Sequence, residues 1–132
     1  MELKHPDSDS GAVKTTENFM AYLNSGNNAG LYNTIHTPHV RISENGVRIY
    51  NNLQELQENY LKDFIDRAGD SWHHTVLDST EILHSSESKV HVCIQWTRYD
   101  ENNVLLATHK ALWIMTRVDG RWGVQARSSF AP

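Results

Sequence analysis

The stretch from residue 109 to 130, HKALWIMTRVDGRWGVQARSSF, constrains the fold more than any other part of the chain. Two alternating segments flank an Asp119–Gly120 step, which is the strongest short-range signal for a β-hairpin because both central residues of a type I′ turn need positive φ. In this turn Val118 faces Arg121, and each residue before Val118 faces the corresponding residue after Arg121 along the two strands. Successive side chains therefore lie on alternate faces of the hairpin.

One face of this hairpin is apolar near the turn and becomes small and polar away from it. Its pairs, from the turn outward, are Arg117/Trp122, Met115/Val124, Trp113/Ala126, Ala111/Ser128 and His109/Phe130. This gradient predicts a core that opens into a cavity, with Trp113, His109 and Ser128 on its wall. The other face carries Leu112, Ile114, Gln125 and Arg127, although a bulge near Ser128 would turn Arg127 inward.

The composition indicates a globular protein with neither a nucleic-acid partner nor a membrane partner. A chain of 132 residues, 39% of them hydrophobic, buries roughly two thirds of its unfolded surface. A net charge of −4 does not favour nucleic acid. The first ten residues have no apolar core of a signal peptide, and no long apolar run follows, so we expect a cytoplasmic protein. Cys93 lacks an internal disulfide partner and is expected to be a buried residue that packs in the core.

The first half of the chain predicts helices and one small hairpin. Residues 1–11 are expected to form a frayed tail, and residues 12–132 a single domain. Apolar residues recur at helical spacing over 12–24, about 29–36 and 53–68. The third helix has the clearest ends, with Asn52 as N-cap, Glu55 three residues later and Gly69 as the stop. Segments 40–42 and 47–50 flank a turn signal and form the small hairpin.

After Gly69 the apolar period changes to two. The predicted strands cover 72–84, 89–99, 104–118 and 121–130. The links between them are short, which favours antiparallel neighbours because parallel crossovers need about a dozen residues or more. The sequence therefore predicts an α+β domain in which three N-terminal helices pack on one face of a long, curved antiparallel sheet.

This order of elements and several local motifs resemble a known superfamily. The sharpest motif is RVDGRWGVQARSS, and HTPHVRI, SWHHT, WTRYD and WGVQARSSFAP add to it. Together they resemble the nuclear transport factor 2-like superfamily, in its SnoaL-like and kinase association-domain branch, and an uncharacterised subgroup within it. The resemblance implies a cone-shaped, cystatin-like fold, a deep pocket between sheet and helices, and often a homodimer through the outer sheet face. Members carry many unrelated chemistries.

Alternation along the strand at 89–99 indicates which of its side chains point inward. We place the more apolar series, Val90, Val92, Ile94, Trp96 and Arg98, inside. Trp96 and Trp113 then form aromatic walls of a ligand cavity, or simply fill the core. A permanently charged Arg98 at an inward position needs an acceptor, which is either an anionic or carbonyl ligand or a carboxylate at the strand end, Asp100 or Glu101. The predicted ligand-binding residues are Arg98, Trp96, Trp113, Arg41, Ser128 and Tyr60.

Four histidines are candidate catalytic residues. His39 stands where many SnoaL-like enzymes carry an acidic residue, so a carboxylate base is not expected, although imidazole also transfers protons. His73 and His74 are consecutive, so only one faces the pocket, and their neighbours do not indicate which. His109 lies on the inward face of its strand. Each histidine has a structural or surface role as the alternative.

The sequence lacks the common signatures of other chemistries. It contains no helical H-x-x-x-H and no Cys-x-x-Cys, so we expect no metal site. It also has no G-x-S-x-G elbow and no phosphate-loop or dinucleotide fingerprint, so we expect no cofactor and no nucleophilic serine.

Three functions remain compatible with these residues. The first is a pocket protein that binds a small, partly aromatic or anionic organic molecule without turning it over. The second is a cofactor-independent acid–base enzyme of the isomerase, cyclase or dehydratase type that uses histidines, with Arg98 or Trp113 stabilising an oxyanion. The third is a homodimeric association module. Its interface would use the outer hairpin face formed by Leu112, Ile114, Gln125 and Arg127.

Overall fold

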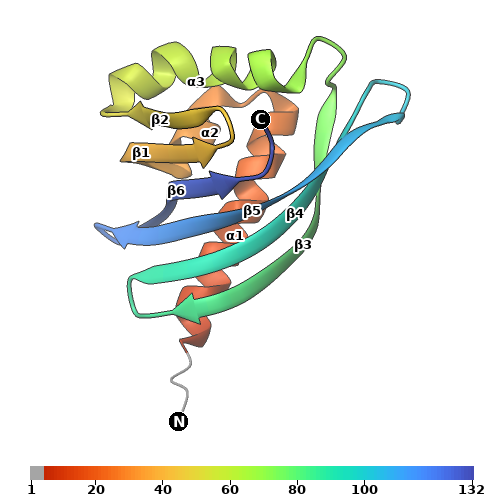
Figure 1. Cartoon of the computed structure of the whole chain (residues 1–132). Coiled ribbons are helices and arrows are strands. Elements are labelled where there is room, and N and C mark those ends of the chain that lie inside the picture. The colour runs from red at the N-terminus through yellow and green to blue at the C-terminus, as the bar shows by residue number, and fades with distance from the viewer. Residues whose placement is uncertain (1–4) are drawn as a thin grey trace.

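The computed structural model describes residues 5–132, which form three helices and one six-stranded sheet (Figure 1). The elements are α1 (Pro6–Ser25), α2 (Asn28–Asn33), β1 (Ile35–Ser43), β2 (Gly46–Tyr50), α3 (Leu53–Ala68), β3 (His74–Ser85), β4 (Lys89–Tyr99), β5 (Leu105–Val118) and β6 (Arg121–Ser129). The strand order is β2-β1-β6-β5-β4-β3. Only β1 and β6 run parallel. The predicted α+β class is confirmed.

The long strands curve around the helices. Figure 1 shows α1 lying along the inner face of β3, β4 and β5, while α3 crosses the wide end beside β2. Phe19 of α1 packs edge-on against Trp113 of β5, with ring centroids 4.9 Å apart. Tyr60 of α3 contacts the same Phe19 ring at 6.3 Å. These aromatic contacts join both helices to the sheet around one core.

The first helix begins earlier than the sequence pattern predicts. It starts at Pro6, a position where the backbone N–H would have no partner within the helix, so proline loses nothing there. The carboxylates of Asp7 and Asp9 stabilise the helix because they lie at its N-terminal end, which carries a partial positive charge. The Ser8 hydroxyl donates to the Glu87 carbonyl at 3.0 Å and ties this turn to the β3–β4 link. The prediction of a frayed tail is therefore wrong for residues 6–11, whereas residues 1–4 of that tail lie outside the described residues.

The second helix ends earlier than predicted. It stops at Asn33 rather than near residue 36, and the chain enters β1 at Ile35. Ile35 pairs with Val124 of β6, and the Val124 N–H donates to the Thr34 carbonyl at 2.9 Å. This pairing with a distant strand overrides the local helical pattern. The third helix has its predicted ends, since the Asn52 side chain accepts from the Glu55 N–H at 2.9 Å and Gly69 caps the end with φ 89°.

The strand predictions and the inward series on β4 are confirmed. The 89–99 strand has its predicted bounds, and the other three long strands agree to within two residues. Val90, Val92, Ile94, Trp96 and Arg98 are all buried. At the hairpin turn, Asp119 and Gly120 have φ of 52° and 76°, as a type I′ turn requires.

A bulge in β6 changes the register of the hairpin. The predicted pairing holds from Val118 to Met115, which faces Val124, but Ile114 then faces Ala126, leaving Gln125 as an extra residue. Beyond this point, Trp113 faces Arg127 and Ala111 faces Ser129. The predicted wall position of Ser128 and the outward position of Arg127 are therefore wrong, because one inserted residue reverses every later side chain.

The predicted dimer face changes in the same way. Leu112, Ile114 and Gln125 are half-buried residues of the hairpin, whereas Arg127 is buried within the core side of the sheet. The Gln125 amide is held by the Thr116 hydroxyl, which donates to Oε1 at 2.9 Å, and by the Pro38 carbonyl, to which Nε2 donates. The homodimer stays a prediction, without Arg127 in its interface. Within residues 5–132, no helix is long and apolar enough to cross a membrane.

Because α3 carries Tyr60 and Arg67 into the interior, its N-cap supports the placement of these two side chains. We expect Asn52→Ala to lower the free energy of unfolding by about 1 kcal/mol, because the Glu55 N–H loses its acceptor. Urea unfolding followed by circular dichroism measures this loss. Lys62→Ala, at an exposed position of the same helix, is the control and is expected to change stability by less than about 0.5 kcal/mol. Equal effects of the two variants would contradict the capping role.

Candidate functional site: an arginine-lined cavity

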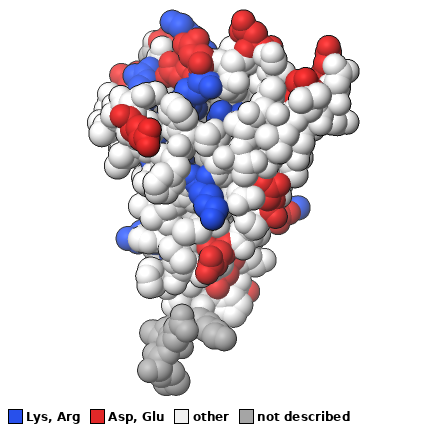
Figure 2. All heavy atoms as spheres, turned by 45° about the vertical axis from the view of Figure 1, so that its right-hand side comes forward, with Lys and Arg blue, Asp and Glu red and all other residues white. Residues whose placement is uncertain are grey.

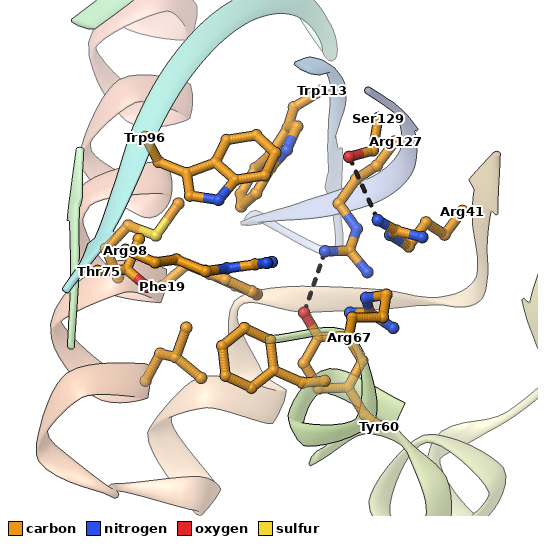
Figure 3. Close-up of a pocket in the computed structure, with 13 residues that line it drawn as sticks. Phe19, Arg41, Tyr60, Arg67, Thr75, Trp96, Arg98, Trp113, Arg127 and Ser129 are labelled. Carbon is orange, nitrogen blue, oxygen red and sulfur yellow. Dashed lines mark hydrogen bonds between the residues drawn. The ribbon is translucent and has the colours of Figure 1, made fainter. Parts of the chain in front are cut away.

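A small cavity lies between the helices and the inner face of the sheet (Figure 3). Its volume is about 30 Å³. The lining residues are Phe19, Met20, Leu23, Arg41, Tyr60, Phe64, Arg67, Thr75, Trp96, Arg98, Trp113, Arg127 and Ser129. By the same measure one water needs about 10–15 Å³, so the space accommodates a compact chemical group.

Four arginines line this cavity, and they come from four different elements. Arg41 lies on β1, Arg67 on α3, Arg98 on β4 and Arg127 on β6. Figure 3 shows their guanidinium groups converging on the same space. Among residues 5–132, no Asp and no Glu belongs to the lining. Four of the seven arginines in a chain of net charge −4 are thus gathered in one place without a carboxylate.

The surface of the protein has a different charge pattern from this interior. Figure 2 shows Asp and Glu side chains scattered over the visible face, with Lys and Arg as separate spots among them. The ion pairs found within residues 5–132 also involve other arginines, Arg48 with Asp63 and Arg117 with Glu87. The positive charge of the cavity is therefore not neutralised by such a pair.

Arg98 is the central member of the cluster. Its side chain is buried, with 5% of the residue exposed, and its Nε has no hydrogen-bond partner among residues 5–132. Burial, followed by the nearby charge of Arg67, lowers the pKa of Arg98 to about 10, so the group is still charged at neutral pH. The strand-end carboxylates of Asp100 and Glu101 form no ion pair with it; Asp100 instead accepts from backbone N–H groups of its own turn.

The bulge brings Arg127 into the same cavity. Its Nε donates to His39 Nε2 at 3.0 Å, and its NH1 donates to the Tyr60 hydroxyl at 3.1 Å. The remaining NH2 is buried and has no partner within the described part of the chain. Burial lowers the pKa of Arg127. Two contacts thus hold this guanidinium in one orientation, with its third nitrogen free to donate.

Aromatic rings cover the faces of the inner guanidinium groups. Arg98 lies over the Phe64 ring at 5.4 Å, and Arg127 lies over Tyr60 at 5.3 Å and Trp113 at 5.8 Å. Such cation–π contacts stabilise the charge without using the N–H groups. The unpaired donors Arg98 Nε and Arg127 NH2 therefore stay available to an acceptor, and guanidinium edges match the oxygens of a carboxylate or phosphate.

Arg41 and Arg67 lie at the boundary between the cavity and an outer groove, whose volume is about 320 Å³. Arg41 NH2 donates to Ser129 Oγ at 3.3 Å and to the Ala131 carbonyl at 3.0 Å. Burial, together with the charges of Arg67 and Arg127, lowers the pKa of Arg41 to about 10. Arg67 Nε is buried and unpaired among residues 5–132. Both arginines thus join the interior to the groove.

His39 lies behind Arg127 rather than in the cavity. The residue is fully buried, and its Nδ1 lies 3.1 Å from the Val124 carbonyl while its Nε2 accepts from Arg127. This arrangement requires the neutral tautomer with the proton on Nδ1. Burial, followed by the Arg127 charge, lowers the pKa of His39 to about 3. The imidazole is therefore a neutral support for Arg127, with both nitrogens engaged.

The other candidate histidines also lie outside the cavity lining. His73 is exposed and precedes β3, and His74 stacks on Tyr99 with ring centroids 5.2 Å apart. Thr75, the next residue, is the one that lines the cavity. His109 has the predicted inward position opposite Trp96, but it is only half-buried. Burial, then the charges of Arg98 and Arg41, lowers its pKa, so the positive field extends to this end of the strand.

The structure brings together five of the six predicted ligand-binding residues and adds others. Arg41, Tyr60, Trp96, Arg98 and Trp113 all line the cavity, whereas Ser128 is exposed and Ser129 takes its place. Arg67 follows Tyr60 by seven residues, two helical turns, so the helical stripe contained a signal for it. Arg127 carried no such signal, because its position depends on the bulge.

Comparisons with known proteins concern the fold. A protein of unknown function with a cystatin-like fold from Nostoc punctiforme superposes with a TM-score of 0.77 at 12% identity, over 100% of this chain and 96% of that one. A nuclear transport factor 2-like protein of unknown function from Shewanella oneidensis superposes with a TM-score of 0.71 at 17% identity, over 92% of this chain and 98% of that one. A ketosteroid isomerase-like protein from Erwinia carotovora superposes with a TM-score of 0.67 at 15% identity, over 92% of this chain and 93% of that one.

No protein-family model and no curated protein sequence matches the chain. The solved structures nevertheless agree with one another on architecture, as does a further nuclear transport factor 2-like protein from Salmonella enterica, with a TM-score of 0.65. The chain has the cystatin-like fold of nuclear transport factor 2-like proteins, and the predicted fold is confirmed.

The buried His39 makes stability depend on pH. Its pKa falls from 6.5 to about 3 on folding, so the unfolded chain binds more protons between these values and stability decreases as pH falls below about 6.5. Between pH 7 and 5 we expect a loss of about 2 kcal/mol from this residue, at about 1.4 kcal/mol per pH unit. Urea unfolding at the two pH values measures the loss.

His39→Gln is the informative variant, because an amide can also donate to Val124 and accept from Arg127 but does not titrate. We expect it to remove the part of the pH dependence that His39 contributes. His73→Gln replaces an exposed histidine and should leave the dependence unchanged. If both variants kept the full slope between pH 7 and 5, the assignment to His39 would be incorrect.

Proposed function

We propose that the protein binds a small organic anion in the arginine-lined cavity. The observation that carries this proposal is the chemistry of the lining, to which the described part of the chain contributes four guanidinium groups and no Asp or Glu side chain. Buried donors without acceptors are costly, and a buried charge is retained in proteins when it is paired with an opposite charge. The missing acceptor is supplied by the oxygens of a bound anion.

The apolar part of the lining supports an organic anion. Phe19, Met20 and Leu23 of α1 line the cavity together with the arginines. Trp96 and Trp113 add aromatic walls. A molecule with one anionic group and a compact apolar portion satisfies both halves of this surface, since ligand pockets combine an apolar lining with a few fixed polar groups.

The alternative of an acid–base enzyme has weaker support from this geometry. A general base must reach the proton that it removes, within about 2.6–3.2 Å or through one water. His39 has both nitrogens engaged, and the other three candidate histidines do not line the cavity. Its remaining support is that some solved structures of similar fold are described as ketosteroid isomerase-like.

The proposed function predicts opposite effects of Arg98→Met on binding and on stability. Methionine keeps the apolar stem and removes the charge. We expect affinity for butyrate to fall at least about tenfold, because a charge-assisted hydrogen bond contributes about 1.5–3 kcal/mol. The unliganded protein should become equally stable or more stable, because an uncompensated buried charge is removed. Isothermal titration calorimetry and thermal unfolding measure the two effects.

Arg117→Gln is the matched control, since Arg117 is an exposed arginine whose ion pair among residues 5–132 is with Glu87 at 3.6 Å. We expect this variant to bind butyrate with the affinity of the unmodified protein. If Arg98→Met bound butyrate as tightly as the control, or if Arg98→Met destabilised the unliganded protein by several kcal/mol, the proposed role of Arg98 would be wrong.

A further inference from the structure

We propose that the bound anion carries two negative charges, one neutralised inside the cavity by Arg98 and Arg127 and the other at its boundary by Arg41 and Arg67. This inference rests on the proposed anion-binding function and specifies its ligand class. Two kinds of molecule share the required chemistry: a phosphate monoester, with both charges on one group, and a short dicarboxylate, with one charge at each end.

The number of unpaired guanidinium nitrogens supports a second charge. Buried nitrogens without partners in the described chain occur on three of the four arginines, namely Arg67 Nε, Arg98 Nε and Arg127 NH2. A single carboxylate has two oxygens, which suit one bidentate arginine contact. A single bound carboxylate therefore leaves N–H donors on the other arginines without acceptors. It also offsets only one of the four positive charges, and the three that remain repel each other.

The positions of the arginines indicate where each charge lies. Arg98 and Arg127 line the inner cavity only, whereas Arg41 and Arg67 line both this cavity and the outer groove. Positive charge therefore continues from the enclosed space to the groove. A cavity of about 30 Å³ holds little more than one head group, so the rest of the ligand lies in the groove of about 320 Å³.

The acidic residues of the groove form no ion pair with Arg41 or Arg67 within residues 5–132. Asp63 accepts from Arg48 Nε at 2.8 Å and from the Tyr50 hydroxyl at 2.6 Å. Asp66 is exposed to solvent and forms no ion pair within residues 5–132. Arg41 NH2 donates to three oxygens near the end of the described chain, Ser129 Oγ at 3.3 Å, Ala131 O at 3.0 Å and Pro132 O at 3.2 Å, and none of these belongs to an Asp or Glu side chain. Arg67 Nε has no acceptor among residues 5–132, and the second charge of the ligand supplies one beside Arg41.

Binding of matched mono- and dianions tests this inference. At pH 8, succinate and butyrate have the same chain length but charges of two and one. We expect succinate or methyl phosphate to bind at least tenfold more tightly than butyrate in calorimetric titrations. Sulfate and methyl phosphate carry both charges on one group, so their affinities relative to succinate distinguish the two kinds of ligand. The second ionisation of a phosphate monoester lies near pH 6, so methyl phosphate should bind more weakly at pH 5 than at pH 8, while sulfate should change less.

Arg67→Gln tests where the second charge lies. We expect this variant to lose at least tenfold in affinity for the preferred dianion and less than threefold for butyrate. Arg67→Lys keeps the charge and should restore part of the preference. Arg98→Met should weaken binding of every anion, and Arg117→Gln is again the control. Circular dichroism confirms that each variant is folded.

The outcomes separate this inference from the function on which it rests. Equal affinities for succinate, methyl phosphate, sulfate and butyrate would overturn the dianion proposal and leave anion binding intact. An equal loss for butyrate and dianions in Arg67→Gln would overturn the assignment of the second charge to the boundary. Failure of every anion to bind the unmodified protein would overturn both the dianion proposal and the proposed function.

Discussion

The extra residue in β6 is the constraint on which the candidate site depends. Gln125 has no partner across the hairpin, so the pairing shifts by one and Trp113 comes to face Arg127 instead of Ala126. Contacts of the Gln125 side chain to Thr116 and Pro38 hold the shift in place. Without it, Arg127 would lie on the outer face, and the cavity would lose a guanidinium and the partner of both His39 and Tyr60.

The cavity is a place where buried charge lowers the stability of the protein. Burial lowers the pKa values of Arg41 and Arg98 to about 10, which reflects the cost of keeping these groups charged in the interior. Aromatic rings and neutral oxygens reduce that cost, through Phe64 under Arg98 and Ser129 beside Arg41. They do not remove it, because neither provides an opposite charge.

The inner cavity also illustrates why perturbed histidines are not by themselves catalytic. His39 has the largest pKa change among the histidines, but the cause is burial behind Arg127, and its two nitrogens serve as donor and acceptor for a structural contact. Tyr60 completes the same arrangement from α3, accepting from Arg127 while its ring lies under the guanidinium. Both residues position the arginine, and the arginine is the group that faces the cavity.

Local patterns in the sequence determined the hairpin turn, the N-cap and end of α3, and the inward series of β4 that contains Trp96 and Arg98, because each depends on neighbouring residues or on strict alternation. The register beyond Met115 was decided only by the tertiary structure, since a bulge forms where distant groups hold the extra residue. The convergence of Arg41, Arg67, Arg98 and Arg127 was likewise decided by tertiary structure. These residues are far apart in the chain, and their shared charge becomes visible only where four elements meet.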